Sequence, residues 1–331
     1  MSPSQLDLLN RFQRDFPLVP QPFGEIAKRL GRSERWVLDT LSGLQAHGTV
    51  SRVGAVFAPN TVGASTLAAL SVPAARLAGT AARVSAHPAV THNYARDHAW
   101  NLWFVVTAAD AGALAASLEE IEDAADSGPL LDLRLEEEFH IDLGFDLGPA
   151  PKLAKEIVVR RRPIPLDLTS RERMLVDALA EGLPLVPSPF AAVGERLDLD
   201  EAQTIAHVDR WVKHGVVRRF GVVVRHAELG FGANVMAVWD VPDDQVSALG
   251  GALARVPGIT LCYRRRTVPP DWTYNLFCMV HGESPAPVRA LLSDAARQCG
   301  LDRYPAAILP TLLRFKQRGA THWRPREVAH A

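Results

Sequence analysis

The sequence predicts an α+β fold, a tandem repeat in which each copy joins a winged helix-turn-helix to a ferredoxin-like βαββαβ domain. Three observations predict it. Two long segments of the 331-residue chain match each other at a separation of 167 residues, which later rises to 169 and then to 174. Each copy opens with apolar residues at helical spacing and a short wing-like strand. Strand and helix patterns then alternate to the end of the copy.

The repeat is read from matching stretches. FPLVPQPFGEIAKRL starts at Phe16 and LPLVPSPFAAVGERL starts at Leu183, which is 167 positions later. HGTVSRVGAVF likewise matches HGVVRRFGVVV at the same separation. We therefore predict winged helix-turn-helix units over residues 1–60 and 171–226 and ferredoxin-like domains over residues 61–147 and 227–320. A Pro-rich linker over 148–170 joins the two copies, and residues 321–331 form a tail.

The front end of the first copy contains three helices. Apolar residues at helical spacing predict a helix over 4–16, and Pro22 stands where a second helix tolerates proline. Ser33 is a suitable N-cap for a third helix, which Gly48 ends. TVSRVGAVF follows as the wing.

The second part alternates strands and helices. STLAALSVP, VTHNYARD, AWNLWFVVTA and LDLRLEEEFHIDL are typical of strands, and two helical segments separate them in βαββαβ order. The second copy repeats this order from Val235 to about Phe315. Helices are therefore expected on one face of each sheet, and the two sheets of the chain can pair as an internal pseudo-dimer.

Composition excludes several classes of protein. The net charge of −1 argues against a chain that coats nucleic acid, and three cysteines without CxxC spacing give neither a disulfide framework nor a zinc site. No apolar run approaches the roughly 20 residues that a membrane span needs. We expect a cytoplasmic protein that does not contact membranes and holds no metal.

The helix-turn-helix units do not have the charge that DNA binding requires. In the second copy, Asp198, Asp200 and Glu201 lie at the helix end that would enter the major groove. Carboxylates there would repel phosphates, whereas Arg, Lys, Asn and Gln are the residues that read DNA. DNA binding is therefore not expected, and the units are expected to be structural or dimerising elements.

Two neighbouring strands in each copy carry unusual chemistry. Because side chains alternate along a strand, His92, Tyr94 and Arg96 share one face. Tyr263 and Arg265 are their counterparts, but Leu261 replaces the histidine. On the following strands, the second copy has His281 where the first has a threonine. The other candidate binding residues are Asn101, Trp103, His140, Asn275, Phe277, Lys316 and the basic pair Arg264 and Arg266.

The arginines indicate an anionic ligand. A guanidinium group binds a carboxylate through two parallel hydrogen bonds, so several arginines beside aromatic residues suit a flat polycarboxylate. A solvated basic loop remains open as the alternative for the arginine-rich stretch at 264–266. Each copy has one histidine on these two strands, His92 in the first and His281 in the second. Their unequal positions are consistent with one complete site or with two unequal ones.

The order of domains resembles that of the Lrp/AsnC regulators, and the motifs resemble those of the siroheme decarboxylases. RVGAVF, HNYAR, NLWFVVTA, CYRRR, YNLFCMVHG and LLRFKQRG carry the second resemblance, which covers nearly the whole chain. A fused chain is similar to the form found in haem d1 synthesis, and the separate subunits of the alternative haem pathway are close relatives. Leu261 departs from the His-x-Tyr pattern and puts a second independent site in doubt.

The resemblance implies a reaction and its partners. Siroheme would lose CO2 from its C12 and C18 acetates to give 12,18-didecarboxysiroheme, without a cofactor. Other proteins of the haem d1 pathway or a homologous subunit would be the protein partners. His92 would act as general acid, with Tyr94 and His281 as further catalytic candidates, while the arginines anchor carboxylates.

Two other functions are considered from the same residues. A tetrapyrrole-responsive transcription regulator would keep the ligand and omit catalysis, and the acidic DLDEAQ segment argues against it. An amino-acid sensor of the Lrp type would not need so many arginines and aromatic residues on its strands.

Overall fold

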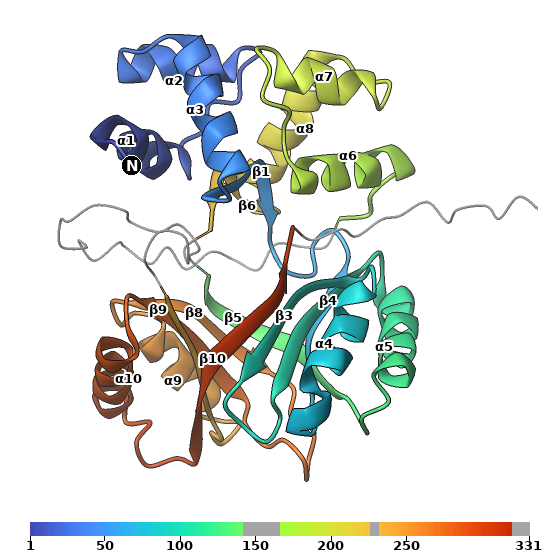
Figure 1. The fold of residues 1–331 in the computed structure, drawn as a ribbon, viewed down its shortest axis with the longest axis vertical. Helices are drawn as coiled ribbons and strands as arrows, with labels where there is room; N and C mark the ends of the chain where they lie inside the picture. The colour runs from blue at the N-terminus through green and yellow to red at the C-terminus, as the bar shows by residue number, and fades with distance from the viewer. Residues whose placement is uncertain (142–165, 226–231, 320–331) are drawn as a thin grey trace, which may run out of the picture.

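The computed structural model describes residues 1–141, 166–225 and 232–319, and they form two layers (Figure 1). The predicted tail and most of the predicted linker lie outside these ranges. The winged-helix layer contains α1 (Pro3–Phe12), α2 (Pro22–Leu30), α3 (Glu34–Ala46), β1 (Val50–Phe57), α6 (Ser170–Glu181), α7 (Pro189–Glu195), α8 (Glu201–Lys213) and β6 (Val217–Val224). Both predicted helix-turn-helix units are therefore present.

Local sequence signals set the helix limits in this layer. The Ser33 hydroxyl accepts a hydrogen bond from the Trp36 backbone N–H, as predicted for the N-cap of α3. Gly31 ends α2 in the left-handed conformation, with a φ of 62°. The first helix is shorter than the predicted 4–16, because it ends at Phe12.

The two winged-helix units share one hydrophobic core. Their wings, β1 and β6, pair antiparallel as a two-stranded ribbon, with Gly54 opposite Gly221. A Cβ atom at Gly221 would lie 2.2 Å from the Phe12 carbonyl oxygen, so the second wing can pack against α1 only with glycine there. The two units therefore form a single body.

The other layer is an eight-stranded closed barrel rather than two separate sheets. Its strands run in the order β10-β3-β4-β2-β5-β8-β9-β7. The first copy supplies β2 (Ala64–Leu70), β3 (Val90–Arg96), β4 (Leu102–Ala108) and β5 (Leu131–Ile141). The second copy supplies β7 (Ala233–Trp239), β8 (Ile259–Arg265), β9 (Leu276–Gly282) and β10 (Ala306–Gln317).

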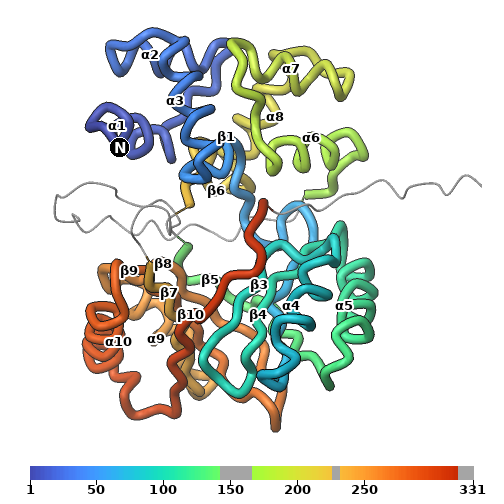
Figure 2. Tube along the Cα trace, in the orientation of Figure 1, coloured from blue at the N-terminus to red at the C-terminus, as the bar shows by residue number. Residues whose placement is uncertain are grey.

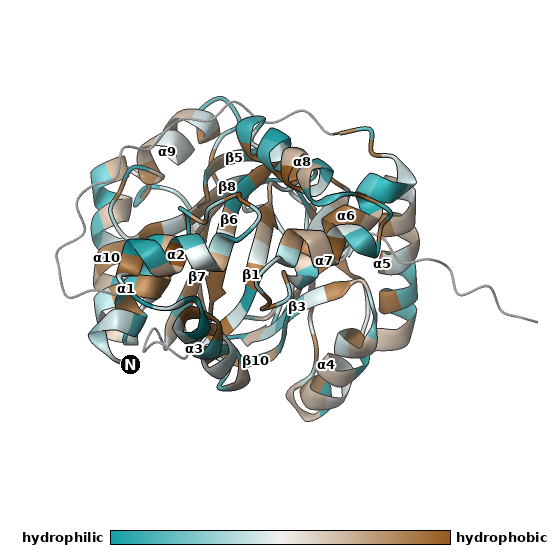
Figure 3. Ribbon diagram, turned by 90° about the horizontal axis from the view of Figure 1, so that it is seen from above, coloured by the Kyte–Doolittle hydropathy of each residue, from teal (hydrophilic) through white to brown (hydrophobic). Residues whose placement is uncertain are grey.

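The last strand of each copy closes the barrel. Strand β5 pairs with β2 of its own copy and β8 of the other, and β10 pairs with β7 and β3 in the same way. Helices cover the outside in two pairs, α4 (Leu77–Ala86) with α5 (Ala111–Ala125), and α9 (Val246–Leu253) with α10 (Pro285–Cys299). Figures 2 and 3 show these pairs on opposite sides of the barrel.

Candidate active site

Strand β3 directs three chemically active side chains into the barrel. His92 and Tyr94 stack with ring centroids 6.2 Å apart, and the Arg96 guanidinium lies 5.8 Å from the Tyr94 ring. Between them, Asn93 points outward, where its amide donates to the Ala81 carbonyl of α4. The predicted alternation along this strand is therefore confirmed. The backbone of His92 pairs with Gln317, the last residue of β10. Figure 1 shows this end of β10 facing the winged-helix layer.

The two inward arginines cross from one copy to the other. Arg96 donates from Nη1 to the Leu309 carbonyl of β10 at 2.9 Å, and Arg265 donates from Nη1 to the Leu133 carbonyl of β5 at the same distance. The Nε of each is buried without a hydrogen-bond partner among the described residues. Burial lowers the pKa of both guanidinium groups to about 10, so they remain cations at neutral pH. Each is a buried cation in a position to bind an anion.

The two inward tyrosines differ in their electrostatic surroundings. Burial raises the pKa of both phenols. At Tyr94 this rise is opposed by the positive charges of Arg96 and Arg314, whereas at Tyr263 it is opposed by Arg265 and increased by the carboxylate of Glu138. Tyr94 is therefore the phenol in the more positive surroundings, which favour proton donation to a bound anion.

His281 is held in a chain of hydrogen bonds. The Asn234 amide donates to its Nε2 over 3.2 Å, and Asn234 itself accepts from the Thr311 hydroxyl. This places the ring proton on Nδ1, which lies 2.9 Å from the Thr260 hydroxyl, and that hydroxyl donates to the Met279 carbonyl. Both ring nitrogens therefore have partners, an arrangement typical of a positioning residue.

Trp103 and Phe277, which were predicted to line the pocket, form part of an aromatic plug. Both are almost completely buried and pack around Trp272, whose ring centroid lies 5.1 Å from that of Trp103. Trp103 donates from Nε1 to the Trp100 carbonyl at 2.6 Å. Trp103 is opposite Tyr94 in the β3–β4 pairing. The plug residues Trp103 and Phe277 are therefore packed in the core and are not open walls of a pocket.

Asn101 and Asn275 have matching structural contacts. The Asn101 amide accepts from the Val72 N–H and donates to the Val72 carbonyl, and Asn275 makes the same pair of bonds with Val241. These bonds join the residues just before β4 and β9 to the residues just after β2 and β7. Their side-chain amides are thus occupied by backbone groups.

Several predicted basic residues lie away from the barrel interior. Arg264 forms ion pairs with Glu136 at 2.9 Å and Asp243 at 2.7 Å, and Arg266 is exposed. The Lys316 ammonium donates to the Ser85 and His87 carbonyls at the C-terminal end of α4. His140 is on β5, where its backbone pairs with Cys262. Sequence spacing alone did not indicate that Arg264 has acidic partners.

Two basic residues that the sequence analysis did not single out lie close to the predicted ones. Arg314 is opposite Tyr94 in the β3–β10 pairing, and Arg225 follows the second wing. Together with Phe315, Lys316 and Gln317 they line a small recess of about 130 Å³. The motif LLRFKQRG contained the signal for Arg314, but its position opposite Tyr94 depends on the exchange of β10.

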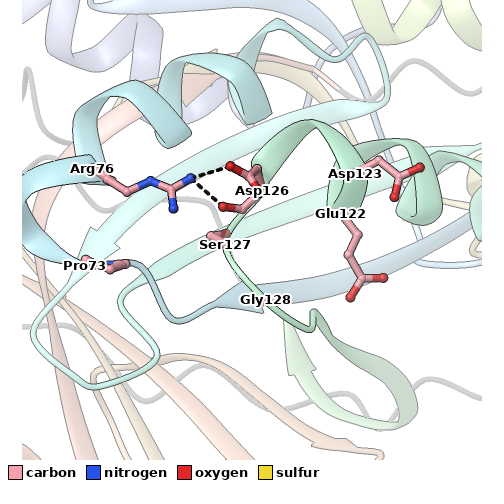
Figure 4. A pocket seen from close by; sticks show the side chains of 7 residues that line it. All are labelled: Pro73, Arg76, Glu122, Asp123, Asp126, Ser127 and Gly128. Carbon is pink, nitrogen blue, oxygen red and sulfur yellow. Dashed lines mark hydrogen bonds and ion pairs between the residues drawn. The ribbon is translucent and has the colours of Figure 1, made fainter.

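A larger recess, of about 480 Å³, lies elsewhere (Figure 4). It is bounded by η1 (Ala74–Arg76) and the end of α5, and Arg76 is already bound to Asp126 there through an ion pair of 3.0 Å. Glu122 and Asp123 complete a mostly acidic lining. An acidic surface hollow does not suit a polycarboxylate, and none of the predicted site residues reaches it.

Within residues 1–141, 166–225 and 232–319, no group of three or more His, Cys, Asp or Glu side chains is placed to hold a metal ion. In the same ranges, no helix combines the length and the apolar character needed to cross a bilayer.

The fold and the inward strands define a class of protein. The family profile of the AsnC-like ligand binding domain matches residues 62–140 and 228–316, and that of the siroheme decarboxylase NirDL-like HTH domain matches residues 6–50 and 172–218. The protein is thus a tandem of helix-turn-helix units and AsnC-like ligand-binding domains.

Similar whole chains specify the family. The siroheme decarboxylase NirDL subunit of Paracoccus denitrificans is 47% identical over 97% of this chain and 98% of its own. A crystal structure of the siroheme decarboxylase NirDL is similar with a TM-score of 0.70 and 26% identity, over 97% of this chain and 94% of that one. Another, in complex with an iron-uroporphyrin III analogue, has a TM-score of 0.68 and 26% identity, over 96% and 93%. The chain belongs to the siroheme decarboxylase family and is an enzyme of the fused NirDL type.

Proposed function

We propose that this enzyme removes CO2 from the C12 and C18 acetates of siroheme to give 12,18-didecarboxysiroheme, a step of haem d1 synthesis. The observation that carries the proposal is the inward face of β3, which holds His92, Tyr94 and Arg96 together. Arg265 of the other copy supplies a second buried cation. A related NirDL structure holds an iron-uroporphyrin III analogue, which supports a tetrapyrrole as the ligand.

The reaction needs one net proton for each acetate. Protonation of the pyrrole carbon adjacent to the one that carries the acetate makes the ring an electron sink. The bond to the carboxylate then breaks, CO2 leaves, and the electron pair forms an exocyclic double bond. Addition of a proton to the exocyclic carbon and loss of the ring proton give the methyl group. His92 would supply the first proton as general acid, because an imidazole can donate near neutral pH.

The other residues would position the ring. Arg96 and Arg265 are cations inside the barrel, and each keeps a buried Nε without a partner in the described part of the chain. They would hold carboxylates of the substrate through charge-assisted hydrogen bonds. Tyr94 would donate from its positively surrounded phenol. Burial of the reacting acetate against the plug would favour CO2 loss, since a carboxylate is poorly solvated in an apolar pocket.

Anaerobic incubation with siroheme, followed by mass spectrometry, tests the reaction. Loss of two CO2 units, with the two new methyl groups located by NMR at C12 and C18, is expected. Bound but unchanged siroheme with the folded protein would contradict decarboxylation. Methyl groups at other ring positions would contradict only the assignment of the acetates.

A further inference from the structure

The small recess lies where the winged-helix layer meets the barrel. Arg225, which follows the second wing, lines it together with Arg314, Phe315, Lys316 and Gln317 from the end of β10. The strand β10 pairs there with β3, so that Arg314 is opposite Tyr94 and Gln317 is opposite His92. The recess therefore adjoins the strand that carries the proposed acid.

The recess is positively charged. Among the described residues, the lining includes two guanidinium groups and one ammonium group and no carboxylate. The Arg225 Nη1 makes a long hydrogen bond of 3.4 Å to the Gly48 carbonyl, and the Arg314 Nη1 donates to the neutral Gln317 side chain at 3.0 Å. Both guanidinium groups are thus paired with neutral oxygens at these contacts.

The equivalent place in the other half of the molecule has a different chemistry. The internal repeat relates Arg225 to Ala58, because their backbone N–H groups donate to the equivalent carbonyls of Thr49 and Val216. It relates Arg314 to Glu138, which is opposite Tyr263 on β8. There the carboxylate is bound by Arg218 of the wing through an ion pair of 2.6 Å, and both side chains are largely buried.

The two sides of the barrel are therefore unequal. On the β5–β8 side an internal ion pair joins the wing to the barrel, and its charges cancel. On the β10–β3 side the wing and the barrel both present cations. A polycarboxylate would be attracted more strongly to the second side, because cations line its wing-to-barrel contact, whereas the first side places the Glu138 carboxylate there.

We propose that Arg225 and Arg314 bind peripheral carboxylates of the tetrapyrrole, so that the wing of the second helix-turn-helix unit forms part of the substrate site and the β10–β3 side is the productive one. The proposal rests on the proposed function. On this proposal, the wing binds carboxylates of a small molecule, whereas the wing of a DNA-binding protein binds nucleic-acid phosphates.

Iron uroporphyrin III, which has eight carboxylates, is a suitable binding probe for the purified full-length chain, and siroheme turnover gives the kinetic readout. Arg225→Ala is expected to raise the Kd for the probe and the KM for siroheme by about five- to thirtyfold, and kcat should change by less than about threefold. Arg225→Lys should recover part of the affinity, because it restores the charge but not the planar fork. Arg314→Gln should weaken binding by a similar factor.

Arg297→Ala is the matched control, since Arg297 is an exposed arginine on α10 that pairs with Asp294. It should bind the probe like the unaltered chain. If Arg225→Ala and Arg314→Gln also bind like the unaltered chain, the inference is wrong while the proposed function stands. If the unaltered chain binds the probe but leaves siroheme unchanged, the proposed function is wrong. A larger Kd of Arg225→Ala for the probe would in that case still support the anion site.

Discussion

The Arg96 guanidinium donates to the carbonyl oxygen of Leu309 at 2.9 Å, although the two residues belong to different copies of the repeat. This hydrogen bond joins β3 to the strand that closes the barrel beside it. Arg265 and Leu133 make the equivalent bond on the other side. Burial of a guanidinium charge costs free energy, and a backbone carbonyl compensates this cost less than a carboxylate would. An anionic ligand that binds the guanidinium group can therefore lower the cost.

Replacement of Arg96 should separate stability from function. The pKa of about 10 in the folded protein lies below the ordinary 12.5, so the charged form is disfavoured by folding. The cost, about 3 kcal/mol, is fully present below pH 10 and is relieved only as the pH rises past it. Arg96→Met removes this cost but also removes the hydrogen bond to Leu309, which offsets part of the gain. The free energy of unfolding of the substrate-free protein should therefore rise by about 1–2 kcal/mol at pH 7.

Denaturant unfolding measures this change, and siroheme turnover by Arg96→Met should fall at least about tenfold. The exposed Arg297→Met is the matched control and should alter neither quantity. A lower stability of Arg96→Met would show that the hydrogen bond to Leu309 outweighs the burial of the charge.

His92 is expected to affect the chemical step rather than binding. His92→Ala should lower kcat by about a hundredfold or more, because a general acid contributes that much to proton transfer. The Kd for iron uroporphyrin III should remain within about threefold. His214→Ala, in the winged-helix layer, is the control. A His92→Ala variant with full turnover would remove His92 from the role of acid.

The two tyrosines should differ in importance. Tyr94 lies between Arg96 and Arg314, whereas Tyr263 lies between Arg265 and Glu138. Tyr94→Phe should therefore lower kcat for siroheme by about ten- to a hundredfold, and Tyr263→Phe by less than about threefold. Steady-state kinetics on both variants compares them directly. Equal losses would indicate that both sides of the barrel react.

Asn101 should prove to be structural. Asn101→Ala removes two hydrogen bonds to Val72 and leaves both backbone groups without that partner, so the free energy of unfolding should fall by about 1–3 kcal/mol. The Kd for iron uroporphyrin III, measured below the unfolding transition, should be unchanged. A clear loss of affinity with unchanged stability would return Asn101 to the substrate site.

DNA binding is not expected from the described helices. Helix α8 begins with Asp200 as its N-cap and Glu201 in its first turn, so the end that would face phosphates is acidic. A mobility-shift assay with DNA from upstream of the protein's own gene should show no specific complex at physiological salt. A specific shift that tetrapyrrole reverses would favour the regulator instead.

The sequence predicted the repeat, the helix-turn-helix units and the inward face of β3, because these depend on local spacing. His92, Tyr94 and Arg96 share that face as alternation requires. The exchange of β5 and β10 could not be read from the sequence, since strand pairing over long separations is not encoded in local periodicity. The recess that brings Arg225 and Arg314 together depends on that exchange. Burial of Trp103 in a plug depends on Trp272, which lies in a hairpin insertion of the other copy.

The pairing of β5 and β10 across the two copies also sets the stoichiometry of the enzyme. A half that contained only residues 1–141 would leave β3 and β5 each with one unpaired edge, and the second half would expose β8 and β10 in the same way. The backbone groups on these strand edges find hydrogen-bond partners only when the two halves associate. A single polypeptide keeps them at equal numbers and makes their assembly independent of concentration, so dilution should not divide the site.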